Sequence, residues 1–280
     1  MENRLSSVEY FLLDMDGTFN LGDRLLPGSL RFVEVLKKQN KGHLFLTNNS
    51  SRVAGDYASK MSHLGLPTTE REVFTSGEAT ARYLLEQGTA RSLFVVGTPA
   101  LEEEFRRYGF EPAAESPQQI VLGFDTTLTY EKLWRLCDLV REGLPFLATH
   151  PDFNCPTERG YMPDTGAMIA FVRASTGREP DLVIGKPNRT IVDIAARKLA
   201  VPIEHMAMVG DRLYTDIALG QTSGIATVLV LSGEATRSDL ERSTFRPDYV
   251  FEDLGKLADW LERNGRPLPD IPHPRGEQAA

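Results

Sequence analysis

The sequence predicts an α/β fold in which a doubly wound parallel sheet forms the core and a second, smaller α/β domain is inserted into it. Short apolar runs alternate with helix-like segments along most of the chain, which is typical of a parallel sheet covered by helices on both faces. The chain has 280 residues, and this length corresponds to two domains at about 150 residues each.

The first elements form a β-α-β unit. Residues 10–13 (Tyr-Phe-Leu-Leu) are predicted to be a buried strand, and apolar residues at helical spacing follow behind Pro27. Residues 43–46 (His-Leu-Phe-Leu) are predicted to be the second strand. The same alternation predicts further strands of the main sheet at 182–184, 206–209 and 225–231. Open parallel sheets bind ligands at the carboxyl ends of their strands, so polar residues there are the first candidates for a site.

The middle of the chain repeats this pattern with strands of its own, at 93–96, 120–122 and 145–148. We therefore predict a core made of residues 1–88 and 182–262, with an inserted domain at 89–181. The last segment, 263–280, is rich in proline and has almost no apolar residues, so it is predicted to be a flexible tail.

Composition excludes several classes of function. The 31 Lys and Arg residues face 39 Asp and Glu residues, the formal net charge is −8, and no basic run concentrates positive potential. We therefore expect neither a nucleic acid nor an anionic membrane surface as a partner. The chain shows no secretion signal and no apolar stretch that could span a membrane, and Cys137 and Cys155 match no redox or zinc pattern. These features predict a cytoplasmic protein.

Two carboxylates end the first predicted strand, in the segment DMDGT. Side chains two residues apart in an extended chain point the same way, so Asp14 and Asp16 can face one site. One of them can then act as a nucleophile while the other serves as general acid and base. An Asp-Gly turn that only closes the strand is the alternative explanation.

Later strand ends also carry polar residues. The second strand ends in the segment TNNS (47–50), where a helix begins. The N–H groups at the start of a helix commonly bind phosphate. Lys186 follows a predicted strand and supplies a positive charge for a phosphate or a carboxylate. Asp211 ends another strand, and Asp216 falls in the first turn of the helix that follows. Taken alone, each is explained by helix capping, by a solvated lysine or by compensation of the helix dipole.

Together, these strand ends favour a cation site beside a phosphate site. Asp14, Asp16 and Asp211 offer oxygen ligands, which suit Mg²⁺ because this ion prefers octahedral oxygen coordination and shares the phosphate oxygens of a substrate. No cluster of His and Cys competes for a softer metal. The sequence therefore predicts Mg²⁺ as the cofactor and a small phosphorylated metabolite as the substrate.

The motifs DMDGT, LTNNS, GKP and GDRLYTD, in this order, resemble the four motifs of the haloacid dehalogenase superfamily of phosphohydrolases. The resemblance covers the chain to about residue 262. The segments TNNSSR, THPD, PDTGAM and GDRLYTDI resemble the NagD-like branch, subfamily IIA, which includes many nitrophenylphosphatases. This resemblance implies a Rossmann-like core with an inserted α/β cap domain of the C2 type between the second and third motifs.

The resemblance also implies a role for each motif residue. Asp14 would be the nucleophile and Asp16 the general acid and base. The residues implied to bind the phosphate are Thr47, Asn48 and Lys186, and those implied to bind the rest of the substrate are Asn49 and Ser50. The residues implied to form the metal site are Asp14, Asp16, Asp211 and Asp216, of which Asp216 more often supports the metal's waters than binds the metal directly.

The inserted segment supplies further candidates. Thr47 and Lys186 lie much farther apart in the chain than the crossover units that join neighbouring strands, so a lid that excludes water and selects the leaving group fits between them. His150 and Asp152 follow a predicted strand of this insert, and Arg159 lies in a predicted loop. We expect these three residues to read the substrate; the alternative is that each is a solvated loop residue.

These inferences predict a Mg²⁺-dependent phosphatase that hydrolyses small phosphate monoesters through an aspartyl phosphate. Sugar phosphates and nucleoside monophosphates are candidate substrates, and aryl phosphates are expected substrates in vitro. The alternatives are a phosphomutase, which the position of the insert disfavours, and a phosphate-binding regulatory protein without turnover, which the two aspartates of the first motif disfavour. The resemblance also makes a homodimer that associates through the cap a reasonable expectation.

Overall fold

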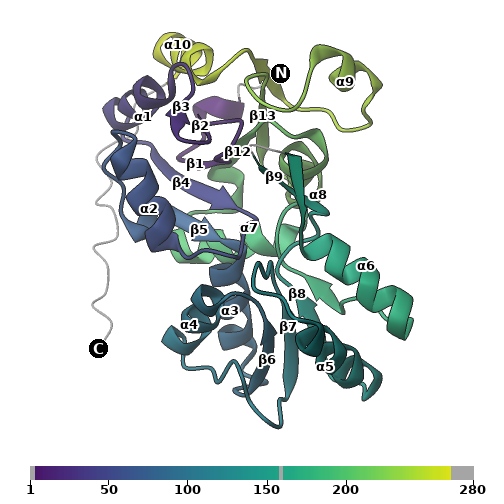
Figure 1. Cartoon of the computed structure of the whole chain (residues 1–280). Helices are drawn as coiled ribbons and strands as arrows, with labels where there is room; N and C mark the ends of the chain where they lie inside the picture. Colours follow the sequence, from purple (N-terminus) through teal and green to yellow (C-terminus); the bar gives the residue numbers. More distant parts are fainter. Residues whose placement is uncertain (1–3, 158–159, 266–280) are drawn as a thin grey trace. The chain divides into compact units, whose positions relative to one another are not determined.

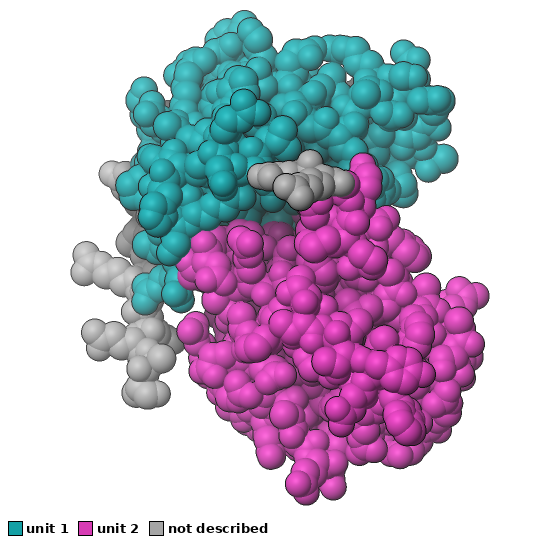
Figure 2. All heavy atoms as spheres, viewed as in Figure 1, with its two compact units in different colours: residues 1–46, 59–72, 192–280 teal, residues 47–58, 73–191 magenta. Residues whose placement is uncertain are grey.

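The computed structural model describes residues 4–157 and 160–265 (Figure 1). Contacts divide the chain into two compact units, coloured separately in Figure 2. Unit 1 comprises residues 1–46, 59–72 and 192–280, and unit 2 comprises residues 47–58 and 73–191. Each unit contains a parallel sheet, as the sequence predicts for an α/β protein with an inserted domain.

Unit 1 is built on a parallel sheet whose neighbouring strands have the order β14-β13-β12-β1-β4. The bounds of these strands are β1 Tyr10–Leu13, β4 Gly42–Thr47, β12 Met206–Gly210, β13 Ala226–Val230 and β14 Tyr249–Phe251. Strand β1 lies between β4 and β12, and its last residue, Leu13, is aligned with Phe45 on one side and Val209 on the other. The carboxyl ends of these strands therefore meet at one edge of the sheet.

Helices and a short hairpin complete unit 1. The hairpin follows β1 and consists of β2 (Asn20–Leu21) and β3 (Arg24–Leu25). The helices within the unit are α1 Ser29–Lys38, α8 Ala218–Ser223, α9 Arg237–Arg242 and α10 Leu254–Asn264. Helices α2 (Ala54–His63) and α7 (Arg189–Leu199) run from one unit into the other along the chain, and 3₁₀ turns lie at Arg4–Ser6, Glu70–Glu72 and Ile203–His205.

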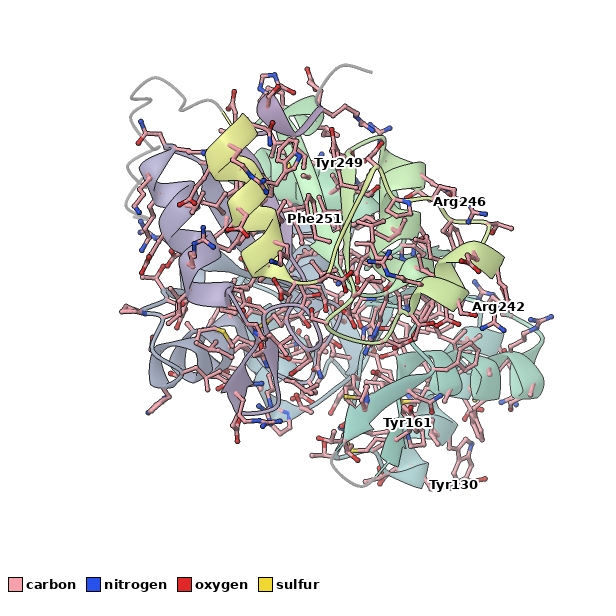
Figure 3. All side chains as sticks on the ribbon, turned by 90° about the horizontal axis from the view of Figure 1, so that it is seen from above. Tyr130, Tyr161, Arg242, Arg246, Tyr249 and Phe251 are labelled. Carbon is pink, nitrogen blue, oxygen red and sulfur yellow. The ribbon has the colours of Figure 1, made fainter. Side chains whose placement is uncertain are left out.

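Helix α10 packs beside both α1 and the edge strand β14. Arg31 of α1 forms ion pairs of 2.6 Å with Asp259 and with Glu262 of α10. Tyr249 and Phe251 of β14, both labelled in Figure 3, face Trp260, with ring centroids 5.6 and 6.4 Å apart. These contacts tie the C-terminal helix to the main sheet.

Unit 2 contains the second parallel sheet, with strand order β11-β8-β7-β6. The strands of the unit are β5 Val73–Thr75, β6 Leu93–Val96, β7 Gln119–Leu122, β8 Phe146–Ala148, β9 Asn154–Thr157, β10 Gly160–Pro163 and β11 Leu182–Val183. Its helices are α3 Ser76–Gln87, α4 Pro99–Arg107, α5 Tyr130–Arg141 and α6 Thr165–Thr176. Strands β9 and β10 pair as an antiparallel hairpin.

Helices cover both faces of this second sheet. Ile120 and Leu122 of β7 join a buried cluster with side chains of α5 and α6, whereas Val121 joins a cluster with side chains of α3 and α4. This alternation follows from the period of two along a strand. Helix α3 thus packs on the inserted sheet, although the sequence analysis assigned residues up to 88 to the core, so the boundaries at 89 and 181 remain predictions.

The structure corrects three expectations about elements. Residues 182–184 were expected in the main sheet, but Leu182 and Val183 pair with β8 of the second sheet, because so short an apolar run fits either sheet equally well. The segment at 157–161 was expected to be a loop, but Thr157 ends β9 and Gly160 and Tyr161 begin β10, whose exposed side chains lack the alternation that marks a strand; residues 158–159 lie outside the described residues. Helix α10 extends to Asn264, into the predicted tail, of which residues 266–280 lie outside the described residues.

No helix within residues 4–157 and 160–265 is both long and apolar enough to cross a membrane.

Candidate active site

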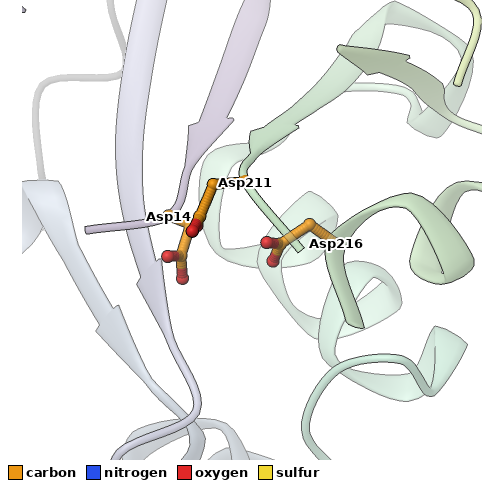
Figure 4. Close-up of side chains that lie close together, drawn as sticks. All are labelled: Asp14, Asp211 and Asp216. Atoms are coloured by element: carbon orange, nitrogen blue, oxygen red, sulfur yellow. The ribbon is translucent and has the colours of Figure 1, made fainter. Parts of the chain in front are cut away.

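Three carboxylates converge at the carboxyl ends of β1 and β12. Asp14 follows β1 directly, Asp211 follows β12, and Asp216 lies in a single turn of π-helix at Leu213–Ile217. Each offers one oxygen atom, and these atoms all lie within 4.8 Å of one another (Figure 4). Asp211 and Asp216 are buried, whereas Asp14 is half-buried. Asp14 is therefore the member of this acidic cluster that a substrate can reach.

The turn after β1 allows this approach because it contains a glycine. The N–H of Asp14 donates to the carbonyl of Val209 at 2.9 Å, which continues the parallel ladder. Gly17 then adopts a φ of +95°, a left-handed conformation that favours glycine. A Cβ at Gly17 would lie 2.3 Å from Oδ2 of Asp211, so a larger residue would displace that carboxylate.

Asp211 is also held by the loop that follows β13. The N–H of Glu234 donates to Oδ2 of Asp211 at 2.7 Å, and the hydroxyl of Thr18 donates to Oδ1 at 3.2 Å. A Cβ at Gly233 would lie 2.0 Å from the same Oδ2. The carboxylate thus lies between the turn after β1 and the loop after β13. We call the contacts made there by Thr18, Gly233 and Glu234 the clasp around Asp211. This loop was not predicted from the sequence, although Gly233, shortly after an apolar strand, was a usable signal.

Arg212 was also missed, and it connects two parts of the site. Its N–H donates to Oδ2 of Asp216 at 3.1 Å, and its side-chain Nε lies 2.9 Å from Oε2 of Glu234. Although burial works in the opposite direction, the three carboxylates of the acidic cluster raise the pKa of Arg212. Its charge therefore partly offsets theirs.

The electrostatics of the acidic cluster suit a divalent cation. Burial, together with the charges of Asp14 and Asp216, raises the pKa of Asp211 to about 7, against the effects of the Glu234 N–H and of Arg212. A cation among the three carboxylates would relieve this repulsion. The donor set consists of carboxylate oxygens, with no His or Cys, and so fits a hard ion such as Mg²⁺.

Asp16 is not part of this cluster, although the sequence analysis counted it among the metal-binding residues. Its side chain is exposed, with Oδ1 accepting a hydrogen bond of 2.7 Å from the amide of Asn20 and lying 3.6 Å from Nζ of Lys60. A carboxylate held in this way at the surface of the turn can exchange protons with a leaving group or with water, so its geometry suits general acid and base catalysis.

The residues expected to bind phosphate belong to unit 2, and two of them contact each other. Oδ1 of Asn48 accepts from the N–H of Lys186 at 2.8 Å, and Nδ2 of Asn48 donates to the carbonyl of Lys186 at 2.9 Å. Both residues are buried. The hydroxyl of Thr47 accepts from the N–H of Asn49 at 3.2 Å, which shapes the turn after β4.

The next two residues differ in exposure. Asn49 is half-buried, and its Oδ1 accepts from the N–H and the hydroxyl of Ser51 at 2.9 and 2.7 Å. Ser50 is fully buried, with its hydroxyl 3.0 Å from that of Thr149 and accepting from the N–H of Phe124 at 2.9 Å. The Ser50 hydroxyl is therefore engaged within unit 2, whereas Asn49 keeps an accessible side.

The candidates in the insert also differ. His150 is fully buried, with Nδ1 2.9 Å from the hydroxyl of Thr149 and Nε2 2.9 Å from Oδ1 of Asp164, so both ring nitrogens have partners. Asp152 is half-buried and accepts from Nδ2 of Asn48 at 3.2 Å. These contacts favour a supporting role for His150. Arg159 lies outside the described residues.

Comparison with known proteins finds the same family at both ends of the chain. A family model described as haloacid dehalogenase-like hydrolase matches residues 11–111, and one described as HAD-hydrolase-like matches residues 183–257. The 5'-nucleotidase YutF of Bacillus subtilis is 34% identical over 257 residues, which cover 92% of this chain and 99% of that protein.

Solved structures match most of the chain. The crystal structure of a 4-nitrophenylphosphatase from Thermotoga maritima has 51% sequence identity and a TM-score of 0.89, covering 92% of this chain and 99% of the other. The crystal structure of a glycerol phosphate phosphatase from Mycobacterium tuberculosis, in complex with magnesium, has 30% identity and a TM-score of 0.83, covering 92% of this chain and 78% of the other.

Proposed function

This chain belongs to the haloacid dehalogenase-like hydrolases, in the NagD-like branch of nitrophenylphosphatases, and we propose that it hydrolyses small phosphate monoesters through a covalent aspartyl phosphate on Asp14. It is a phosphoric monoester hydrolase. The observation that carries the proposal is the acidic cluster, in which two buried carboxylates stand beside Asp14 and only Asp14 is partly exposed. Such a cluster can bind a cation, and its exposed carboxylate, Asp14, can react with a substrate.

In the first step, an oxygen of the Asp14 carboxylate attacks phosphorus in line with the ester oxygen. The new O–P bond forms as the bond to the leaving group breaks, and the phosphoryl group passes to Asp14. Asp16 gives its proton to the leaving oxygen. Its exposed position, fixed by Asn20, supports this role.

In the second step, Asp16 takes a proton from water, and the resulting hydroxide attacks phosphorus of the aspartyl phosphate. The acyl phosphate bond breaks, inorganic phosphate leaves, and the Asp14 carboxylate is restored. The same residue thus acts first as acid and then as base. The clasp around Asp211 keeps its carboxylate in place during both steps.

The phosphoryl oxygens need hydrogen-bond donors and a positive charge. We assign Thr47 and Lys186 to this group, a proposal supported by the order of the motifs and by membership of the family. When bound, Mg²⁺ held by Asp14, Asp211 and Asp216 would offset the charge that gathers on the carboxylates and the phosphoryl oxygens. A relative crystallised with magnesium supports the choice of this ion.

The leaving group is assigned to a class rather than to one compound. The names of the relatives indicate that they act on nucleotides, nitrophenyl phosphate and glycerol phosphate, which share a phosphate monoester and little else. We propose that the inserted domain selects among such esters, and that Asn49, which lies on the turn after β4 and is half-buried, is a further candidate for contact with the leaving group.

A homodimer through the inserted domain is part of the proposal. Tyr130 and Trp134 lie four residues apart on α5, so they share one face of that helix, and their exposed fractions are 77% and 64%. Two large aromatic side chains exposed together mark a surface suited to a protein contact. Trp134→Glu should convert the dimer to a monomer in sedimentation velocity, and a monomeric wild-type protein would exclude this part of the proposal.

Phosphate release tests the proposed function. With a panel of sugar phosphates, nucleoside monophosphates, glycerol phosphate and 4-nitrophenyl phosphate, we expect Mg²⁺-dependent release that a chelator abolishes and added Mg²⁺ restores. Full activity after exhaustive chelation would contradict the metal assignment. Transfer of the phosphoryl group to a second sugar position, in place of release, would favour the phosphomutase alternative.

A further inference from the structure

Lys186 is tied to a single side chain by both polar groups of its main chain. Its N–H donates to Oδ1 of Asn48 at 2.8 Å, and its carbonyl accepts from Nδ2 of Asn48 at 2.9 Å. The two residues are 138 positions apart in the sequence. Because both bonds are made by the main chain of Lys186, they fix where its side chain begins.

Asn48 is in turn held by Asp152. Its Nδ2 lies 3.2 Å from each carboxylate oxygen of Asp152, so its two amide hydrogens serve Lys186 and Asp152. The hydroxyl of Ser76 donates to the carbonyl of Asn48. Asn48 is 5% exposed and Lys186 is 3% exposed, so bulk water does not compete with these bonds. With both amide hydrogens and Oδ1 engaged, the Asn48 side chain has one well-defined position.

The segment that carries Asp152 is itself fixed to helix α6. The carbonyl of Asp152 accepts from the N–H of Gly166 at 2.8 Å, and His150 bonds through Nε2 to Asp164 at 2.9 Å. Asp164 caps α6, where its Oδ1 accepts from the N–H of Thr165 at 2.6 Å. A continuous chain of buried or half-buried polar contacts therefore runs from the start of α6 through Asp152 and Asn48 to Lys186.

We propose that Asn48 and Asp152 are positioning residues that set the location of Lys186 for phosphate binding. The inserted sheet and α6 then act on the phosphate through this lysine, and the Asn48 and Asp152 side chains need not touch the substrate. This inference rests on the proposed function, because only there does Lys186 bind the phosphoryl group. Phosphate binding requires that the charged group be held within a fraction of an ångström of its position, and the residues around it provide this restraint.

Exchanging the donor and the acceptor between positions 48 and 152 tests directly whether these residues position Lys186. Asn48→Asp keeps an acceptor for the N–H of Lys186, but it removes both donors and places a second carboxylate against Asp152. We expect the dissociation constant of inorganic phosphate, measured by calorimetry with Mg²⁺ present, to rise ~10-fold to 100-fold, as loss of a buried hydrogen bond beside a charge predicts.

The double variant Asn48→Asp/Asp152→Asn restores a donor and an acceptor across the same gap. We expect it to recover phosphate binding by about 5-fold or more relative to Asn48→Asp, because the charge repulsion is gone and one hydrogen bond returns. Asn264→Asp in α10 adds the same charge at an exposed site and serves as the matched control. Absence of any recovery in the double variant would overturn the proposal, because a residue that contacts phosphate directly would not be rescued from position 152.

Lys186→Ala separates failure of this inference from failure of the proposed function. If Lys186→Ala leaves phosphate binding unchanged, the assignment of Lys186 to the phosphate is wrong. If it weakens binding, we expect Asn48→Ala to have no further effect in the Lys186→Ala background, since Asn48 acts through the lysine. An undiminished effect of Asn48→Ala in that background would mean that Asn48 acts on the phosphate independently, and the inference would fail. Binding of inorganic phosphate needs no turnover, so each variant can be measured.

Discussion

Removing the charge of Asp211 should stabilise the metal-free protein at neutral pH. Burial beside Asp14 and Asp216 raises the pKa of Asp211 from 3.8 to about 7. Below about pH 4 the group is protonated in both the folded and the unfolded protein, so it has no effect on stability. As the pH rises toward 7, the unfolded chain loses this proton while the folded protein keeps it, so stability falls. The loss is complete above the folded pKa.

The size of this effect follows from the shift. About three pKa units correspond to about 4 kcal/mol, of which about 3 kcal/mol falls between pH 5 and pH 8. Asp211→Asn removes the titration, and the amide oxygen can still accept from the N–H of Glu234. The free energy of unfolding of Asp211→Asn, relative to wild type, should therefore rise by about 3 kcal/mol over this range.

Urea unfolding in the presence of a chelator measures this difference. Wild type, Asp211→Asn and the control Asp239→Asn are compared at several pH values between about 5 and 8. Hydrogen bonds from Thr236 lower the pKa of the exposed Asp239, so its titration lies below this range and its difference from wild type should stay constant. A constant difference for Asp211→Asn as well would refute the electrostatic reasoning. Added Mg²⁺ should stabilise wild type and not Asp211→Asn.

Two further predictions concern catalysis and the clasp around Asp211. Asp16→Asn should lower kcat/KM for an alkyl phosphate by ~10²-fold to 10⁴-fold and much less for 4-nitrophenyl phosphate, whose leaving group needs little protonation; equal losses on both esters would argue against an acid role. Gly233→Ala should weaken Mg²⁺ binding in calorimetry by ~10-fold to 100-fold, because its Cβ would collide with the Asp211 carboxylate. Gly65→Ala, where an added Cβ meets nothing within 4 Å but the φ of +96° strains the backbone, controls for a general loss of stability, and equal affinities in the two variants would contradict the clasp.

The acidic cluster could be predicted from the sequence because strand ends determine it. Asp14 and Asp211 each follow an apolar run, and parallel pairing of β1 with β12 brings such ends together. Asp216 was expected in the helix that follows, and its place in the metal site was implied by the resemblance rather than by its position alone. The structure confirms that these three carboxylates meet.

The supporting contacts could not be predicted in the same way. Glu234 holds Asp211 with its main-chain N–H. Every residue except proline has such a donor, so the residue type does not indicate the contact. His150 was expected to read the substrate or, in the alternative, to be a solvated loop residue, but it is fully buried and bonded to Asp164 before α6, and such packing does not follow from local pattern. Strand β11 was misassigned because two apolar residues do not specify which sheet they join.

The covalent intermediate gives the most direct test of the central claim. Wild type and Asp16→Asn are mixed with 4-nitrophenyl phosphate and Mg²⁺, quenched rapidly with acid and weighed by intact-protein mass spectrometry. We expect an added phosphoryl group on wild type and a larger fraction of it on Asp16→Asn, whose intermediate hydrolyses slowly. Asp14→Asn should carry none, because an amide cannot form the acyl phosphate. A phosphoryl group that persists on Asp14→Asn would contradict the assignment of Asp14 as the nucleophile.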